Sequence, residues 1–174
     1  MTLGSATGTL HLDGNSATRV SIGDLLRLPP TTITNGALRV IAGAGLFGAA
    51  GQTLIGVLDI ESSSGLLTEA ARPAATSLIF PHVAHGNGWF TGLAFATGSR
   101  AASVTVEVYD AAGRSPRTTT ISLQANQQQA RLISEFVPSI TTQFGGYIRV
   151  RSDEPIWAWE IYGSADVLAS GPPF

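Results

Sequence analysis

Two histidines three residues apart, His82 and His85, are the first residues whose type and spacing suggest chemistry. Neutral imidazoles at short spacing are common ligands of zinc and copper. On a strand, however, two positions three apart point to opposite faces, and the third histidine, His11, is distant in the sequence. We therefore predict no bound metal and no cofactor. We assign His82 and His85 to a glycine-rich connection, where they hydrogen-bond to backbone groups that lack a ladder partner.

The tryptophans suggest a second kind of site. Trp157, Trp159 and Ile161 alternate with other residues and share one face of an expected strand. Two aromatic rings on one face of a sheet form a platform on which a sugar stacks. The matching positions upstream in the chain are Ile55 and Val57, which fill a core but offer no ring face. We predict that both tryptophans lie in the core and that Trp159→Ala costs ~3 to 5 kcal/mol of stability. A carbohydrate platform is the alternative.

The carboxylates and nucleophilic side chains of the sequence do not form a recognisable enzyme motif. Glu160 lies on the face opposite the tryptophans, where Glu107, Asp110 or Glu135 are candidates to pair with it. Two carboxylates are the minimum for glycoside hydrolysis, but any β-sandwich brings a few together by chance. The sequence has no cysteine, no Gly-x-Ser-x-Gly elbow and no P-loop, and the glycine-rich run at 43–48 precedes a strand-like segment, not a long helix. We predict a protein that is not an enzyme.

Four residues form a candidate ligand or partner surface. Asn87, Trp89 and Phe90 follow one another in a glycine-rich segment, and Arg149 belongs to a later strand. Arg149 alternates with apolar neighbours, so its expected role is a hydrogen bond or an ion pair on the exposed face of the sheet, with a partner contact second.

Strands must position all of these residues, because apolar and polar residues alternate every two positions through most of the chain. Residues 104–109 form a strand that ends in a turn at 110–113. Residues 118–123 and 131–133, with a polar tip at 126–129, predict a hairpin. The predicted core consists of Trp157, Trp159, Ile161, Val104, Val106, Val108, Ile148, Val150, Leu38, Val40, Ile55 and Val57.

Other breaks in the pattern come at prolines. Residues 147–151 and 156–162 predict two separate strands, divided at Pro155, because proline donates no hydrogen bond to a ladder. Residues 22–28 and 134–137 each precede a proline and predict a short helix.

An internal repeat organises the chain. Residues 31–40 align without a gap with residues 141–150 and share two threonines, a glycine, an arginine and a valine. We therefore predict a partial repeat unit, the C-terminal half, over residues 1–72 and a complete β-sandwich unit over residues 73–174. The fold class is all-β, an antiparallel β-sandwich of Ig-like or fibronectin-like architecture. The partial unit must cover its apolar face by packing against the complete unit or against strands of a neighbouring chain.

Three segments carry a resemblance to a known kind of module: Phe-Pro-His-Val-Ala-His-Gly-Asn-Gly-Trp-Phe at 80–90, Gly-Gly-Tyr-Ile-Arg-Val at 145–150, and Trp-Ala-Trp-Glu-Ile-Tyr-Gly at 157–163. The chain resembles tandem β-sandwich repeat modules of large secreted bacterial proteins. That resemblance implies a small sandwich without an established catalytic site.

Composition narrows the partners. Charged residues make up 13% of the sequence, the net charge is −2, and the ten basic residues are scattered arginines. Nucleic-acid binding and binding to anionic lipid both need clustered basic residues, so we exclude them. No apolar run is long enough for membrane insertion, and no export signal is present in this sequence.

The neutral, hydroxyl-rich and lysine-free composition favours an extracellular or cell-surface location. We therefore predict a non-catalytic structural or adhesive module of a bacterial protein, whose partners are neighbouring repeat units or identical chains. The alternatives are a carbohydrate-binding module that takes an extracellular glycan, or a subunit of an extracellular polymer completed by strands from a neighbouring chain.

Overall fold

A computed structural model describes residues 6–13, 16–28, 57–62, 65–70, 73–114, 116–171 and 173–174. The chain divides into two compact units, Met1–Gly36 and Ala37–Phe174. The repeat boundary at residue 72 stays a prediction. The repeated segment at 31–40 and the glycine-rich run at 43–48 lie outside the described residues, as do Leu38, Val40 and Ile55 and the side chain of Val57.

In the first unit, the described residues include one short helix, α1 (Ile22–Leu26). The Ser21 hydroxyl caps it by accepting a hydrogen bond from the backbone N–H of Asp24, at 3.4 Å. Arg27 closes the helix in the left-handed conformation. The helix predicted over residues 22–28 is confirmed.

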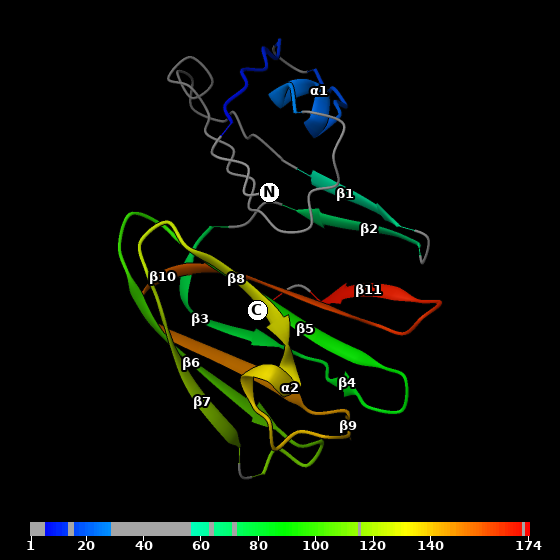
Figure 1. The fold of residues 1–174 in the computed structure, drawn as a ribbon, viewed down its shortest axis with the longest axis vertical. Helices are drawn as coiled ribbons and strands as arrows, with labels where there is room; N and C mark the ends of the chain where they lie inside the picture. Colours follow the sequence, from blue (N-terminus) through cyan, green and yellow to red (C-terminus); the bar gives the residue numbers. More distant parts are fainter. Residues whose placement is uncertain are drawn as a thin grey trace. The chain divides into compact units, whose positions relative to one another are not determined.

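The second unit is built of antiparallel strands (Figure 1). Their bounds are β1 (Val57–Ser62), β2 (Gly65–Ala70), β3 (Ala75–Phe80), β4 (Ala84–His85), β5 (Phe90–Thr97), β6 (Ala102–Tyr109), β7 (Arg117–Leu123), β8 (Gln128–Leu132), β9 (Gln143–Phe144), β10 (Tyr147–Gly163) and β11 (Leu168–Gly171), with one short helix, α2 (Ile133–Phe136). β1 pairs with β2, β4 pairs with β9, and the other seven strands form one curled sheet. The all-β class is confirmed, whereas the two-sheet sandwich stays a prediction.

The long strand β10 organises this sheet. Its first half pairs with β6 on one side and β3 on the other, and its second half pairs with β5 and β11. The register shifts between Arg151 and Ile156, and Pro155 lies within this shift, where it has no ladder hydrogen bond to donate. The prediction of two strands over residues 147–162 is therefore wrong, because the proline falls where the partner strands change.

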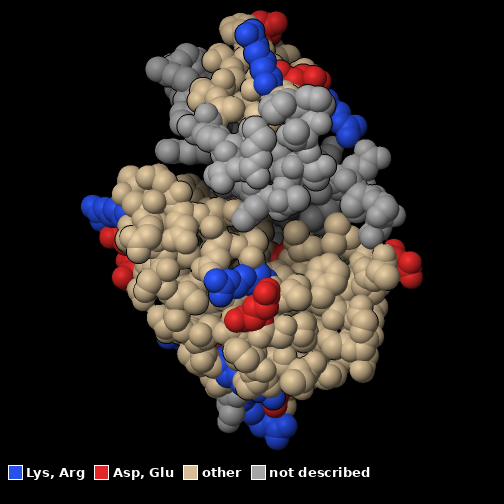
Figure 2. Space-filling model, viewed as in Figure 1, with Lys and Arg blue, Asp and Glu red and all other residues tan. Residues whose placement is uncertain are grey.

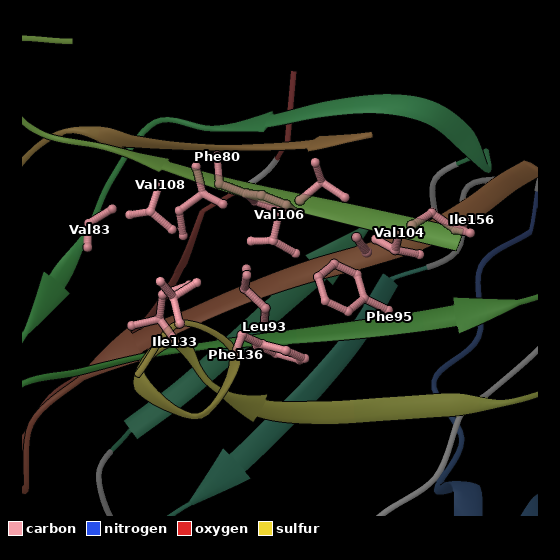
Figure 3. Packing of buried hydrophobic residues seen from close by; sticks show 14 of the residues in the cluster. Phe80, Val83, Leu93, Phe95, Val104, Val106, Val108, Ile133, Phe136 and Ile156 are labelled. Atoms are coloured by element: carbon pink, nitrogen blue, oxygen red, sulfur yellow. The ribbon is translucent and has the colours of Figure 1, made fainter. Parts of the chain in front are cut away.

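Side chains at alternating positions of β6 and β10 form the core (Figure 3). The cluster contains five predicted core residues, Val104, Val106, Val108, Ile148 and Val150. Phe80, Leu93 and Ile133 join them from β3, β5 and α2. The rings of Phe95 and Phe136 meet edge to face at 5.4 Å. The apolar cluster therefore ties both halves of β10 to the strands beside them.

β7 and β8 were expected to form a hairpin, and this prediction is wrong. Both strands exist, but β7 pairs with β6 and β8 pairs with β5, at the two ends of the sheet path. The buried hydroxyl of Thr97 anchors the connection by donating to the carbonyl of Gln124 and accepting from the N–H of Gln127, at 2.6 and 3.0 Å. The chain therefore crosses between the two halves of the sheet at this corner.

Candidate functional site

Trp157 and Trp159 lie on the outer face of β10. The face of β10 that enters the core carries Ile156, Ala158 and Glu160, and the two tryptophans alternate with these residues and are half-buried. The structure therefore corrects the prediction that Trp157, Trp159 and Ile161 belong to the core cluster. β10 continues through the register shift without a change of face, so the buried residues on both sides of the shift, Ile148, Val150, Ile156, Ala158 and Glu160, all have even numbers.

A groove of about 190 Å³ runs beside the two indole rings. It is lined by Pro73, Ala75, Ser77, Leu78, Trp157, Ala158, Trp159, Pro173 and Phe174, and we call it the tryptophan groove. None of these side chains is charged, and the Ser77 hydroxyl joins the indole N–H groups as a polar group. A groove of this kind selects a ligand by its apolar or ring-faced surface.

Pro173 and Phe174 form part of the wall of this groove. Phe174 donates its backbone N–H to the carbonyl of Ile79 and accepts from the N–H of Ile79, each at 2.9 Å. Pro173 is buried, while the side chain of Phe174 is 78% exposed. The edge of β3 that faces away from β10 therefore pairs with the backbone of Phe174.

Glu160 lies on the core face of β10, between Leu93 of β5 and Gly171 of β11. Its side chain is 0% exposed, and neither carboxylate oxygen has a hydrogen-bond partner among the described residues. A Cβ atom at position 171 would lie 2.6 Å from its Oε2, so any larger residue there would require the carboxyl group to move. Burial raises the pKa of Glu160 to about 8. At neutral pH this side chain is a neutral acid enclosed by the sheet.

Arg149 is held in a network on the outer face of the first half of β10. It donates to both oxygens of Glu107, at 2.6 and 3.1 Å, and to the hydroxyl of Tyr109. The hydrogen bond from Arg149 is the main cause that lowers the pKa of Glu107, and the same bond raises the pKa of Arg149. Tyr147 stacks on Tyr109 with ring centroids 4.4 Å apart. This is the structural role expected for Arg149.

The other residues of the predicted surface lie at a tight hairpin between β4 and β5. Asn87 and Gly88 have φ angles of 53° and 85°, which match a type I′ turn, and Gly86 and Trp89 exchange two backbone hydrogen bonds. The Trp89 side chain is 38% exposed, and Phe90 begins β5. Among the interactions of the described residues, none joins Arg149 to this hairpin, so the four residues are not shown to form one surface.

The two histidines have different surroundings. The ring of His82 packs against Tyr162 with centroids 4.6 Å apart. His85 is buried, and its Nδ1 has no partner within the described part of the chain. A buried hydroxyl, that of Thr91, hydrogen-bonds to the N–H and the carbonyl of Ala84, so Thr91 does the work that was predicted for the imidazoles. Across the described ranges, no three His, Cys, Asp or Glu side chains cluster closely enough to hold a metal ion.

A larger and more open recess, of about 370 Å³, lies at the turn after β6. Its polar groups already satisfy one another: Arg117 donates to Gln143 Oε1 at 3.0 Å, and Arg114 Nε lies 3.4 Å from Asp110. Asp110 also accepts from the backbone N–H groups of Ala112 and Arg114. The polar groups of this recess therefore stabilise the turn after β6, and we assign it no ligand.

Sequence reasoning missed the other walls of the tryptophan groove. These walls come from two distant parts of the sequence, Pro73 with Ser77 and Pro173 with Phe174. None of the four residues belongs to a recognisable motif. Their place beside the tryptophans follows from the fold.

No protein-family model matches this sequence, and no curated protein matches it. A solved structure that resembles the fold is a Thermotoga maritima protein titled "Crystal Structure of Thermotoga maritima 1070". The two chains are 13% identical, and the match has a TM-score of 0.48 and covers 56% of this chain and 93% of the other. In the described residues, no helix is long and apolar enough to cross a membrane. Its own strand pairing defines the described part of the chain as an all-β protein with a curled antiparallel sheet.

Proposed function

We propose that this protein is a non-catalytic structural or adhesive module of a bacterial extracellular or cell-surface protein, and that the tryptophan groove is its binding site. The observation that carries the proposal is the position of Trp157 and Trp159 on the outer face of β10, beside a groove with uncharged walls. Large aromatic side chains kept outside the core provide contact area to a partner with little loss of conformational entropy.

The surface charge supports a neutral partner. On the face in view, Figure 2 shows few charged side chains, and acidic and basic groups lie side by side in several places. Several acidic groups are engaged within the fold, since Glu107 is bound by Arg149 and Glu154 pairs with Arg100 at 2.9 Å. Such a surface gives little electrostatic attraction to a charged ligand.

We keep the sandwich architecture and the partial repeat as part of this proposal. What supports the sandwich is that β10 pairs first with β6 and β3 and then with β5 and β11, so two arms of the sheet share one strand. The apolar cluster draws side chains from both arms. This is how two sheets of a small adhesive domain enclose a core.

A neutral glycan is the second candidate ligand. Trp157 and Trp159 are two positions apart on one strand, which separates their Cα atoms by about 7 Å. Two indole rings at this spacing present faces on which neighbouring sugar rings can stack. The groove walls offer few other polar groups to a sugar's hydroxyls, so we rank the glycan after a protein partner.

The test is a binding screen with matched variants. Native protein, Trp159→Ala and Trp89→Ala are applied to an array of neutral glycans and an array of proline-rich and aromatic peptides. We expect a ligand that is lost in Trp159→Ala and kept in Trp89→Ala, because Trp89 does not line the groove. Binding that depends on Trp89 alone, or chemical conversion of the bound ligand, would contradict the proposal.

A further inference from the structure

The strand β7 forms one end of the curled sheet, beside β6 (Figure 1). Its seven residues pair with β6 in one continuous register, without a bulge. Thr118, Thr120 and Ser122 are exposed. Among the described residues, β6 is the only strand that pairs with β7, so the second edge of β7 is open there.

The pairing of β6 identifies the backbone groups on this open edge. The N–H of Ser103 donates to Asp153 Oδ1 of β10 at 2.7 Å, so the backbone of Ser103 faces β10 and not β7. Opposed residues of an antiparallel pair alternate between pairs that exchange hydrogen bonds and pairs that do not. Ser103 and Ser122 are therefore a pair that does not. It follows that the N–H and carbonyl groups of Thr118, Thr120 and Ser122 face the open edge.

Other edges of this sheet are occupied or blocked. At β8, the N–H of Leu132 donates to Glu135 of the following helix at 2.7 Å, and Arg131 adds a charge. At β3, the edge away from β10 pairs with the backbone of Phe174. Soluble proteins protect edge strands with charged residues, prolines or bulges. Residues 118–123 of β7 have none of these.

The sequence of β7 is complementary to a second copy of itself. In antiparallel pairing about a two-fold axis at Thr120, Thr118 lies opposite Ser122 of the second copy, so residues with hydroxyl groups meet on the exposed face. The backbone groups on the two edges can then exchange about six hydrogen bonds. Thr120 already forms a cross-strand pair of this kind inside the chain, with its Oγ1 3.2 Å from that of Thr105.

Arg117 fixes the register of this pairing. In the register centred on Thr120, Arg117 lies opposite Leu123 of the second copy, so the two arginines are at opposite ends of the joined strands. A shift that centres the pairing on Arg117 would bring two like charges together and lose most of the backbone hydrogen bonds.

We propose that β7 of one copy pairs with β7 of a second copy, antiparallel and in the register centred on Thr120, so that two curled sheets join into one. The contact is the same on both copies and closes after two of them, so it gives a dimer and not a fibre. The inference goes beyond the proposed function, because β7 is not part of the tryptophan groove and its partner is an identical chain.

Disulfide trapping tests the register, since the native sequence has no cysteine. Full-length Thr120→Cys places two thiols across the two-fold axis, where opposed Cα atoms are about 5.5 Å apart, a spacing that suits a disulfide. The matched control is Thr118→Cys, on the same exposed face, because the two copies of residue 118 would be about 13 Å apart along the strands. Under mild oxidation, we expect Thr120→Cys to form disulfide dimers at least ~10-fold faster than Thr118→Cys. A mixture of Thr118→Cys and Ser122→Cys should form the heterodimer.

Sedimentation equilibrium measures the association of the native chain without a crosslink. We expect the average mass to rise with protein concentration from that of one chain toward that of two. Thr120→Lys brings two like charges together across the axis and should remain monomeric at the same concentrations. Ala130→Lys adds the same charge at an exposed residue of β8 and should follow the native protein.

Two results would overturn the pairing. One is native protein that stays monomeric up to millimolar concentration, together with Thr120→Cys dimers that form no faster than those of Thr118→Cys. The other is an association that Thr120→Lys leaves unchanged, which would assign the contact to a different surface of the chain. The array screen tests the tryptophan groove separately, so failure of this pairing and failure of the proposed function are distinguishable.

Discussion

Replacing the buried acid Glu160 by glutamine should change how the stability of the protein depends on pH. The side chain is 0% exposed, and burial raises its pKa in the folded protein to about 8, whereas an exposed glutamate has a value of 4.5. Below pH 4.5 the folded and unfolded chains both carry the neutral acid, so Glu160 costs nothing. As the pH rises, the unfolded chain loses its proton first, and the folded state becomes less stable until the folded pKa is passed.

The size of the effect follows from the difference between the two pKa values. A difference of about 3.5 is equivalent to about 5 kcal/mol between pH 4.5 and pH 8 and above, and about 3 kcal/mol of it is present at pH 7. Glu160→Gln keeps nearly the same shape and remains neutral at every pH, so this loss should disappear. The variant should gain on the native protein by about 4 kcal/mol between pH 5 and pH 8.5.

Urea unfolding at a series of pH values, from 5 to 8.5, measures this gain. The control is Glu154→Gln on the same strand, because Glu154 is a partly exposed partner of Arg100 and should follow the native curve. Equal pH dependence in native protein and Glu160→Gln would refute the reasoning, since it would mean that Glu160 ionises in the folded state near its ordinary pKa.

Further predictions concern single side chains, each measured by urea unfolding. Trp159→Ala should destabilise the protein by only about 1 to 2 kcal/mol, because the ring lies on the outer face of β10. A loss above ~3 kcal/mol is the cost expected for a core tryptophan and would show that Trp159 lies in the core. Phe95→Ala should cost about 3 to 5 kcal/mol, because Phe95 is 0% exposed and packs on Phe136. Thr91→Val should cost about 1 to 3 kcal/mol, since both polar groups of Ala84 lose a buried partner, whereas exposed Thr118→Val should stay within about 0.5 kcal/mol.

The sequence predicted the local elements well where alternation and turn residues act alone. β6, the turn after it and both short helices follow from residues close together in the chain. Pairing between strands could not be predicted in the same way. The corner that separates β7 from β8 depends on hydrogen bonds from Thr97, which lies about thirty positions before its partners Gln124 and Gln127.

The face of the tryptophans was predicted wrongly because hydrophobicity is a poor guide there. Along Trp-Ala-Trp-Glu at 157–160, the large apolar residues point outward and the acid points inward. The internal repeat pointed the same way, because it matches Trp157 and Trp159 to the aliphatic residues Ile55 and Val57. The deciding fact is the continuity of β10 from Ile148 to Glu160, and a sequence with Pro155 in its middle does not reveal it.

The tryptophan groove as the binding site is tested most directly by the indole N–H signals of the three tryptophans in a ¹H–¹⁵N NMR spectrum. The strongest ligand from the array screen is titrated into the labelled native protein. We predict that the signals of Trp157 and Trp159 shift together and saturate at a single dissociation constant, while the signal of Trp89 stays in place. Saturable binding that shifts Trp89 and leaves Trp157 and Trp159 unchanged would contradict the account.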